Sequence, residues 1–411
     1  MITTKPAYSI FSIPVIVGAL GYFVDIYDLL LFGIVRKPSL ADLGLNPDQV
    51  TTVGEKILSG QMWGLLIGGI IWGVMGDKRG RLSVLFGSII LYSLANIANG
   101  LVVNTTQYAI VRFLAGVGLA GELGAGITLV SELLSKEKRG IGTSLVAGIG
   151  LTGAVVAFFI SKEFHWRTCY YIGGGLGLLL LLLRVSVFES GMFHQVKNMD
   201  VQRGNFFQFF NNGKRLRKYL LSILIGLPTW YVIGVLITFS DQFAKYLNVQ
   251  GEVQPGKAIM FAYAGISIGD VLIGLVSQWL KSRKKALYLF YVITAVFMVL
   301  FFMQRGGSAA QMYVLCASLG FGTGFWAIFV TMAAEQFGTN LRATAATTVP
   351  NMVRGSLSLI ILPLFKALRT NESIGYINAG IITGIVVMVI SVIATYFTEE
   401  TFGKDLNYVE M

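Results

Sequence analysis

Twelve apolar segments, each about as long as a membrane-spanning helix, recur along the 411 residues of the chain. A helix needs roughly 20 mostly apolar residues to cross the hydrocarbon core of a bilayer. The segments lie near 9–35, 56–76, 82–103, 107–134, 140–161, 167–187, 218–240, 258–280, 286–304, 310–336, 343–368 and 374–397. We therefore predict an all-α membrane protein with twelve transmembrane helices.

The composition excludes most other classes of protein. Hydrophobic residues make up 55% of the chain and charged residues 13%, with a mean hydropathy of +0.70. A soluble domain carries about 25% charged residues, and its exterior must be wetted by water. A soluble enzyme, a disordered chain and a secreted disulfide-bonded domain are therefore excluded.

The longest polar connection divides the chain into two nearly equal halves. We predict a first six-helix bundle over 1–188, a basic linker over 189–217 and a second six-helix bundle over 218–411. With an even number of spans, about 20 of the 32 Lys and Arg residues fall in the termini, the even-numbered loops and the linker. Because cytoplasmic loops collect positive charge, we expect both termini on the cytoplasmic side of the cell (inner) membrane. The net charge of +11 thus follows topology, and no nucleic-acid partner is expected.

The two halves also repeat each other in sequence. The stretch from Glu132 to Arg139 recurs loosely from Glu335 to Arg342, at an offset of 203 residues. The segment 73–81 has a decayed counterpart over 274–284, at an offset of 201. Near-constant offsets indicate duplication of a six-helix unit. In transporters built from such repeats the substrate site lies at the repeat interface, near the bilayer midplane.

Several short motifs carry a resemblance to a known family. The loop after the second segment has the form G-x-x-x-D-[RK]-x-G-R, and the fourth segment has the form R-x-x-x-G. Their residues are Gly73, Asp77, Lys78, Gly80, Arg81, Arg112 and Gly116. Both forms match signatures of the major facilitator superfamily, and the stretch from Glu335 to Thr344 resembles a loop of its sugar and organic-ion porters. The resemblance covers the whole chain and implies two six-helix pseudo-repeats in the major facilitator fold.

The resemblance also implies a branch and a gate. Helix 4 around Gly121–Gly124 is similar to the metabolite:proton symporters, and 21–28 is similar to helix 1 of the phosphate:proton symporters. In this superfamily charged contacts at the cytoplasmic helix ends hold the inner gate shut. The matching residues here are Gly73, Asp77, Arg81, Glu132, Arg139, Glu335 and Arg342. From the residues alone, these would be only a solvated charge cluster. Gln278 replaces the acid in the second-half motif, which predicts asymmetric gate contacts.

Few ionisable residues lie at membrane depth, and such residues are functional candidates because they are costly there. Asp25 and Asp28 share roughly one face of helix 1, while Arg112 and Glu122 lie on helix 4. A buried carboxylate can change its protonation state as a cation approaches or leaves. In the resembling sugar porters a helix 1 Asp pairs with the helix 4 Arg, as Asp28 and Arg112 would. We predict a proton-coupling site; the alternative is a static ion pair that joins the helices.

Helix 11 offers a candidate substrate-binding residue. Asn351 and Arg354 lie three positions apart, after Pro350, so both can face a central cavity. A guanidinium without an acid on its own helix could bind a substrate carboxylate through two hydrogen bonds. The alternative is that Arg354 pairs with Asp270 or another acid of the protein.

Other candidate binding residues are aromatic or amide side chains. Trp230 and Tyr231 follow Pro228 in helix 7, and Trp326 lies in helix 10. They could cover an apolar or cationic part of a substrate, or they could pack against lipid or other helices. Gln61 could hydrogen-bond a substrate or join two helices.

Together these features predict a secondary active transporter that takes up a small organic solute with protons by alternating access. The solute is predicted to carry a carboxylate, as in an organic acid, an amino acid or a betaine. The alternatives are a proton antiporter that exports small molecules, and an uncoupled facilitator or transporter-like sensor. No enzymatic activity, cofactor or metal site is expected. The expected partners are the solute, protons and the lipid bilayer, and the chain is expected to act as a monomer.

Overall fold

The structure, a computed structural model, describes residues 9–184 and 203–410. Within these ranges twelve helical stretches are long and apolar enough to cross a membrane. Their bounds agree with the predicted segments to within a few residues at most ends. The predictions of an all-α fold and of twelve spans are confirmed.

The helices follow one another with short connections. In the first half they are α1 (Ile13–Asp42), α2 (Pro47–Arg79), α3 (Arg81–Leu101), α4 (Thr105–Leu119), α5 (Glu122–Leu133), α6 (Lys136–Leu151), α7 (Gly153–Glu163) and α8 (Trp166–Leu183). In the second half the α-helices are α10 (Gly213–Ile225), α11 (Leu227–Tyr231), α12 (Ser240–Tyr246), α13 (Pro255–Leu280), α14 (Arg283–Met303), α15 (Ala309–Gly322), α16 (Trp326–Glu335), α17 (Arg342–Ser356), α18 (Leu362–Arg369) and α19 (Gly375–Phe397). A short 3-10 helix, η2 (Phe206–Phe209), precedes α10, and two π-helices, η3 (Val232–Ile237) and η4 (Leu357–Ile361), follow α11 and α17. Of the predicted linker, residues 189–202 lie outside the described residues, and helix α10 begins at Gly213.

Some spans are broken near mid-depth. The fourth span is split between α4 and α5, where the indole nitrogen of Trp72 donates to the Val117 carbonyl at 2.6 Å. The tenth span is split between α15 and α16, and π-helices interrupt the seventh and eleventh spans. Broken helices leave backbone groups free of their usual partners, and transporter sites are commonly built at such places.

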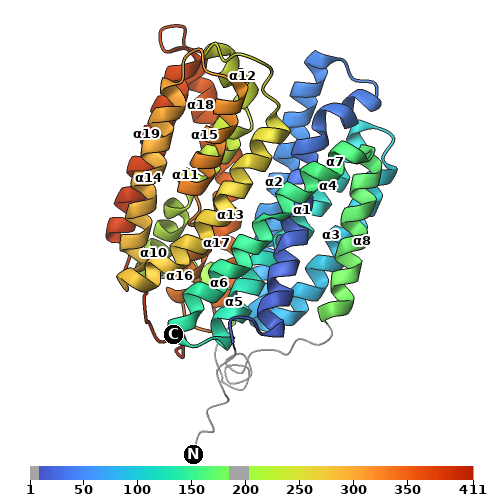
Figure 1. Cartoon of the computed structure of the whole chain (residues 1–411). Helices are drawn as coiled ribbons and strands as arrows, with labels where there is room; N and C mark the ends of the chain where they lie inside the picture. The colour runs from blue at the N-terminus through green and yellow to red at the C-terminus, as the bar shows by residue number, and fades with distance from the viewer. Residues whose placement is uncertain (1–8, 185–202, 411) are drawn as a thin grey trace, which may run out of the picture.

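The first-half helices (blue to green) and the second-half helices (yellow to red) gather on opposite sides of Figure 1. The start of α1 and the segment after α19 lie at the same end, at the bottom of that view, as an even number of spans requires. Gly80 alone joins α2 to α3 at this end, with a φ of 103° that favours glycine.

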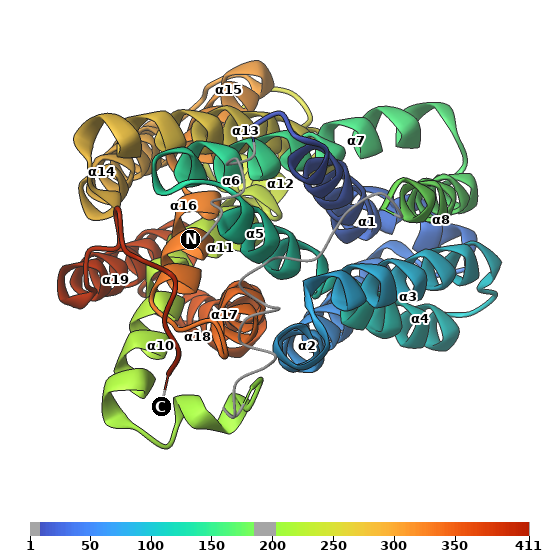
Figure 2. The same cartoon turned by 90° about the horizontal axis from the view of Figure 1, so that it is seen from below.

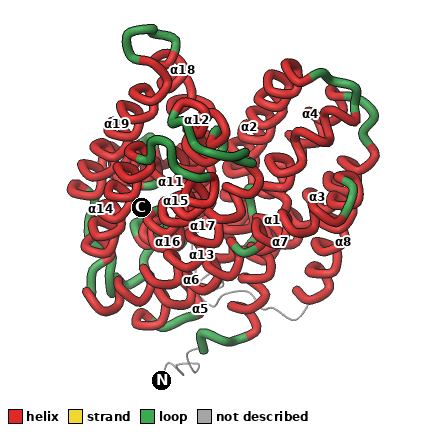
Figure 3. The backbone as a smooth tube through the Cα atoms, turned by 45° about the horizontal axis from the view of Figure 1, so that its top comes forward, coloured by secondary structure: helices red, strands yellow, loops and turns green. Residues whose placement is uncertain are grey.

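The two ends of the bundle differ. At the end where α1 starts, α5, α16 and α17 from both halves lie together in the middle (Figure 2); we call this the closed end. At the opposite end the upper parts of α2 and of α12 and α18 diverge in Figure 3, although Lys366 of α18 still donates to Glu55 of α2 at 3.2 Å. A vestibule of about 600 Å³ lies there, lined by residues of α1, α2, α12 and α18, among others. We call this the open end.

Candidate functional site

A ring of charged side chains joins the two halves at the closed end. Glu132, at the end of α5, accepts a hydrogen bond from Arg81 of its own half at 2.8 Å. The same oxygen accepts one from Arg342 of the other half at 3.0 Å. All three side chains are buried. A carboxylate shared by two arginines from different halves can form only while the closed end is shut.

A second triad mirrors the first. Glu335, at the end of α16, pairs with Arg283 of its own half at 3.2 Å and with Arg139 of the other half at 3.5 Å. The predicted gate residues are therefore brought together, and Arg283 completes them. Sequence reasoning missed Arg283, although its offset of 202 residues from Arg81 is a signal that could have found it.

A further contact beside the charge ring has no counterpart in the described part of the other half. Asp77, near the end of α2, accepts hydrogen bonds from the backbone N–H groups of Ala343 and Thr344 at 3.1 and 2.8 Å and from the Thr344 hydroxyl at 2.7 Å. It thereby satisfies the first turn of α17 in the opposite half. A Cβ at Gly73 would lie 3.0 Å from the Thr344 Cα, so this helix crossing needs a glycine. On the other side, the Gln278 amide nitrogen has no hydrogen-bond partner among the described residues.

The mid-depth charges of the first half lie on α1 and α4. Arg112 donates to the backbone carbonyl of Asp28 at 3.2 Å and to the Asn96 side chain at 3.4 Å, and it lies over the Tyr170 ring. The side-chain ion pair expected between Asp28 and Arg112 is therefore not formed here, because the Arg112 guanidinium is held by other acceptors. Within the described residues, neither Asp28 nor Asp25 has a hydrogen bond to its carboxylate.

Glu122 has a partner that sequence reasoning missed. At the start of α5 it forms a buried ion pair through two hydrogen bonds with Arg184, which directly follows α8. Arg184 also donates to the Leu85 carbonyl at 2.8 Å. This pair is hard to predict from sequence, since Arg184 ends an apolar run and has the pattern of a charge at the membrane surface. Asp25 lies within electrostatic reach of both members and of Arg354.

Arg354 lies near the middle of the eleventh span, in α17 of the second half. It is buried, donates to the Asn351 side chain at 3.2 Å and lies 5.8 Å from the centre of the Trp326 ring. The alternative pairing with Asp270 is not made, because Asp270 accepts the Ala327 N–H at 3.0 Å at the start of α16. Asn351 in turn donates to the Ala120 carbonyl at 2.9 Å, at the break in the fourth span of the first half.

The remaining candidates divide into two groups. Trp230 and Trp326 line the innermost cavity together with Arg354. Tyr231 is fully buried and donates to the Gly380 carbonyl of α19 at 2.6 Å, so its hydroxyl is used within the second half. Gln61 donates to the Leu29 carbonyl of α1 at 3.1 Å, which matches the interpretation of a side chain that joins two helices.

Cavities form a path from the open end toward Arg354. The vestibule of about 600 Å³ shares Arg36 and Glu55 with a cavity of about 120 Å³. That cavity shares Arg36 with a third of about 50 Å³, whose wall is otherwise mostly apolar. The third shares Trp230 with the innermost space of about 10 Å³ around Arg354. Access therefore narrows from the open end inward.

Comparison with known proteins places this architecture in a family. The model of the Major Facilitator Superfamily matches residues 18–363. The chain belongs to this superfamily. It is 24% identical to the niacin transporter NiaP of Acinetobacter baylyi, over 96% of this chain and 95% of that protein. It is also 24% identical to the sialic acid transporter NanX of Escherichia coli, over 90% and 89% of the two chains.

A solved structure shows the same fold. The proton:xylose symporter XylE superposes with a TM-score of 0.77 at 17% identity, over 97% of this chain and 98% of that one. This superfamily member is therefore a multi-pass membrane transporter of small organic solutes and not an enzyme. The sequence-based recognition of the family is confirmed.

Proposed function

We propose that the protein is a symporter that takes up a small organic carboxylate together with protons by alternating access. The observation that carries the proposal is the environment of Arg354. Its guanidinium is buried at the inner end of the cavity path, and it donates a hydrogen bond to an amide, Asn351, rather than to an acid of the described residues. A buried guanidinium is stabilised by a carboxylate that it can bind through two hydrogen bonds.

The wall around Arg354 supports a substrate with an apolar body. Apart from Arg354, the innermost cavity is lined by aliphatic and aromatic side chains, two tyrosines and one threonine. This space of about 10 Å³ would have to widen before a solute could bind, and its lining would then meet the apolar part of the solute while few polar groups orient it. Niacin and sialic acid, named for two relatives, both carry a carboxylate. The apolar wall favours a flat aromatic acid such as nicotinate over a polyhydroxylated acid.

Asp25 is the proposed proton acceptor in a cluster with Asp28, Arg112 and Glu122. Its carboxylate is buried and has no hydrogen bond among the described residues, so its ionised form needs a nearby cation. Arg354 and Arg184 are the cations within its electrostatic reach, and Arg184 is already paired with Glu122. When a substrate carboxylate binds Arg354, Asp25 loses that compensation and takes up a proton. Substrate and proton would then bind together, which is what symport requires.

The charge ring supports alternating access. Its interhalf contacts, from Arg342 to Glu132 and from Arg139 to Glu335, would break when the closed end opens. We infer that the closed end, with both termini, faces the cytoplasm and that the open end faces outside, in the inner membrane. The two six-helix bundles, joined by the linker, would rock within a single monomer.

Uptake into proteoliposomes tests this proposal. A thermal-shift screen of nicotinate, benzoate, amino acids, sugars and phosphate first selects the class of compound that stabilises the purified protein. Uptake of the radiolabelled hit should then be accelerated by an inward proton gradient and slowed by a protonophore. Uptake that ignores both would indicate a facilitator, and uptake driven by an outward gradient would indicate an antiporter. A hit without a carboxylate would contradict the substrate class.

A further inference from the structure

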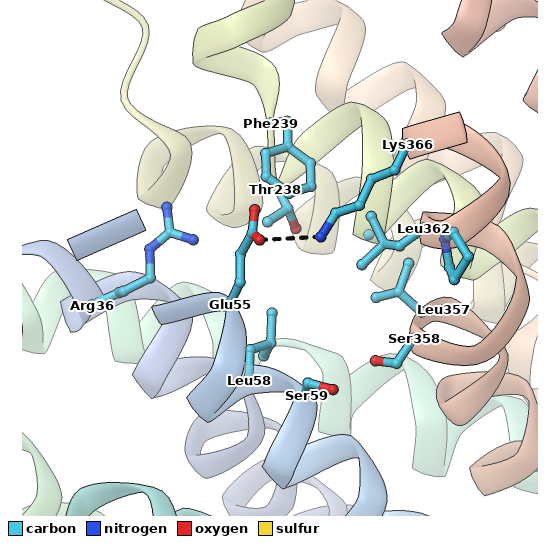
Figure 4. A pocket seen from close by; sticks show the side chains of 12 residues that line it. Arg36, Glu55, Leu58, Ser59, Thr238, Phe239, Leu357, Ser358, Leu362 and Lys366 are labelled. Atoms are coloured by element: carbon cyan, nitrogen blue, oxygen red, sulfur yellow. Dashed lines mark hydrogen bonds and ion pairs between the residues drawn. The ribbon is translucent and has the colours of Figure 1, made fainter. Parts of the chain in front are cut away.

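The path from the vestibule to Arg354 contains a second guanidinium. Arg36, near the outer end of α1, lines the vestibule and the next two cavities of the path. Figure 4 shows its guanidinium facing the space beside Glu55, opposite Lys366. A substrate that enters from the open end must therefore pass this side chain before it reaches Arg354.

Arg36 is fixed in place without a dedicated counterion. Its aliphatic stem packs on α2, where a Cβ at Gly54 would lie 2.6 Å from the Arg36 Cδ. Its Nε is buried and has no hydrogen-bond partner within the described part of the chain. Glu55 and Asp241 are the acids within its electrostatic reach. A partly desolvated guanidinium with an unused donor attracts an anion more strongly than a fully hydrated one.

One of the two acids near Arg36, Glu55, is engaged elsewhere. Glu55 of α2 accepts a hydrogen bond from Lys366 of α18 at 3.2 Å, across the two halves (Figure 4). Both members are partly exposed, and such surface pairs contribute little, about 0–1 kcal/mol. An incoming carboxylate can therefore displace Glu55 from Lys366 at small cost.

We propose that Arg36 and Lys366 form an outer anion-binding station, which captures the substrate carboxylate before it moves inward to Arg354. The station rests on the proposed carboxylate substrate. Arg36 would bind the carboxylate through two hydrogen bonds, and Lys366 would add a single charge from the opposite half. Because α1 and α18 belong to different halves, an anion held between them also draws the open end together.

The third cavity explains why capture would be transient. Beyond Arg36 its wall consists of apolar side chains with Thr238 as a polar exception, and it leads to Trp230. This space of about 50 Å³ would have to widen before the apolar body of the substrate could enter it. Transfer to Arg354 then exchanges one guanidinium for another at the two ends of the apolar stretch.

Uptake kinetics of Arg36→Gln test the station, with radiolabelled nicotinate and benzoate as probes. We expect the KM for the transported acid to rise about tenfold, because a charged hydrogen-bond donor is lost, while the maximal rate changes less than about twofold. Arg36→Lys should restore part of the affinity. Added salt should raise the KM of the wild type more than that of Arg36→Gln. Lys56→Gln removes an exposed charge next to Glu55 and serves as the matched control, with an unchanged KM.

The outcomes separate the station from the transport function. If the wild type takes up neither of these acids nor any carboxylate selected by the thermal-shift screen, the proposed function fails. If the wild type transports an acid and Arg36→Gln has the KM of Lys56→Gln, the station alone is refuted. Should Arg36→Gln not fold, Lys366→Gln replaces it, with an expected rise in KM of about threefold. An unchanged KM in that variant would also refute the station.

Discussion

The two halves of the molecule are alike at the closed end and different at mid-depth. At the closed end each half supplies a glutamate that holds one arginine of its own half and one of the other. At mid-depth the 203-residue offset pairs Glu122 with Phe325, and Arg354 with Leu151. Each of these charged residues in one half thus corresponds, by the repeat offset, to an apolar residue in the other.

We infer from this difference that the two halves have taken on different roles in transport. A gate, as proposed for the charge ring, needs matching contacts from both halves, because both triads must separate together. Substrate binding and proton coupling need only one copy of each group, and a second buried charge would add a desolvation cost. The first half therefore retains the acids proposed for coupling, and the second retains the guanidinium proposed for the substrate.

The largest expected effect comes from breaking the Glu122–Arg184 pair. Arg184→Ala leaves a buried carboxylate unpaired and should lower the free energy of unfolding by about 3–5 kcal/mol. Glu122→Leu combined with Arg184→Met imitates the apolar second half and should recover most of that loss. Thermal unfolding in detergent measures both. If the double variant is no more stable than Arg184→Ala, the pair does not simply replace apolar packing.

Substitution of Arg354 should abolish high-affinity binding. Arg354→Gln removes the guanidinium and should weaken carboxylate binding about 100-fold, because truncating one partner of a buried charge pair costs roughly 2–5 kcal/mol. Equilibrium binding of the acid selected by the thermal-shift screen measures the change. Arg305→Gln, at an exposed arginine of the same half, is the control. Equal affinity of the two variants would remove Arg354 from the binding site.

The likeness of the two triads can be tested at the gate. Glu132→Gln and Glu335→Gln should each destabilise the closed end by about 1–2 kcal/mol, because each weakens hydrogen bonds between charged groups. Spin labels at the exposed positions Lys78 and Lys285, on opposite halves, report the separation. Both variants should increase the long-distance population to a similar extent. A shift in only one of them would show that the mirrored contacts are not energetically equivalent.

The smallest effect is expected at Glu400, beyond the last span. Partial burial would raise the pKa of its carboxylate, but hydrogen bonds from the Ser282 hydroxyl and from the backbone N–H groups of Phe402, Arg283 and Lys284 outweigh burial and lower the pKa. A lowered pKa stabilises the fold above the unfolded value of about 4.3, and this contribution is lost as pH falls through the folded value.

Glu400→Gln should therefore lower the free energy of unfolding at pH 6 by about 1 kcal/mol or less, which appears as a slightly lower Tm. The difference from the wild type should shrink below about pH 4, where the wild-type carboxylate is protonated as well. Thermal unfolding of both proteins across this range checks the sign. A difference that grows toward acid pH would contradict it.

The sequence predicted the spans, and the residues that gather in the charge ring, because both depend on local patterns; the gating role of that ring stays a prediction. Apolar length defines a span, and the repeat offset relates Glu132 to Glu335. It predicted mid-depth contacts poorly, because these depend on which way a side chain turns after a helix breaks. The Asp28 and Arg112 side chains share no hydrogen bond in this conformation, and the bond from Arg184 to Glu122 joins residues of different spans. The roles of Asp25 and Arg354 stay predictions.

Proton movement caused by the substrate is the most direct measure of proton symport. Proteoliposomes that contain a pH-sensitive dye are held without a proton gradient, and the transported acid is added outside. We predict that the interior acidifies with the wild type, and that Asp25→Asn still exchanges labelled for unlabelled acid without acidification. A protonophore and empty liposomes control for diffusion of the neutral acid. Uptake by the wild type without acidification beyond the empty liposomes would contradict proton symport.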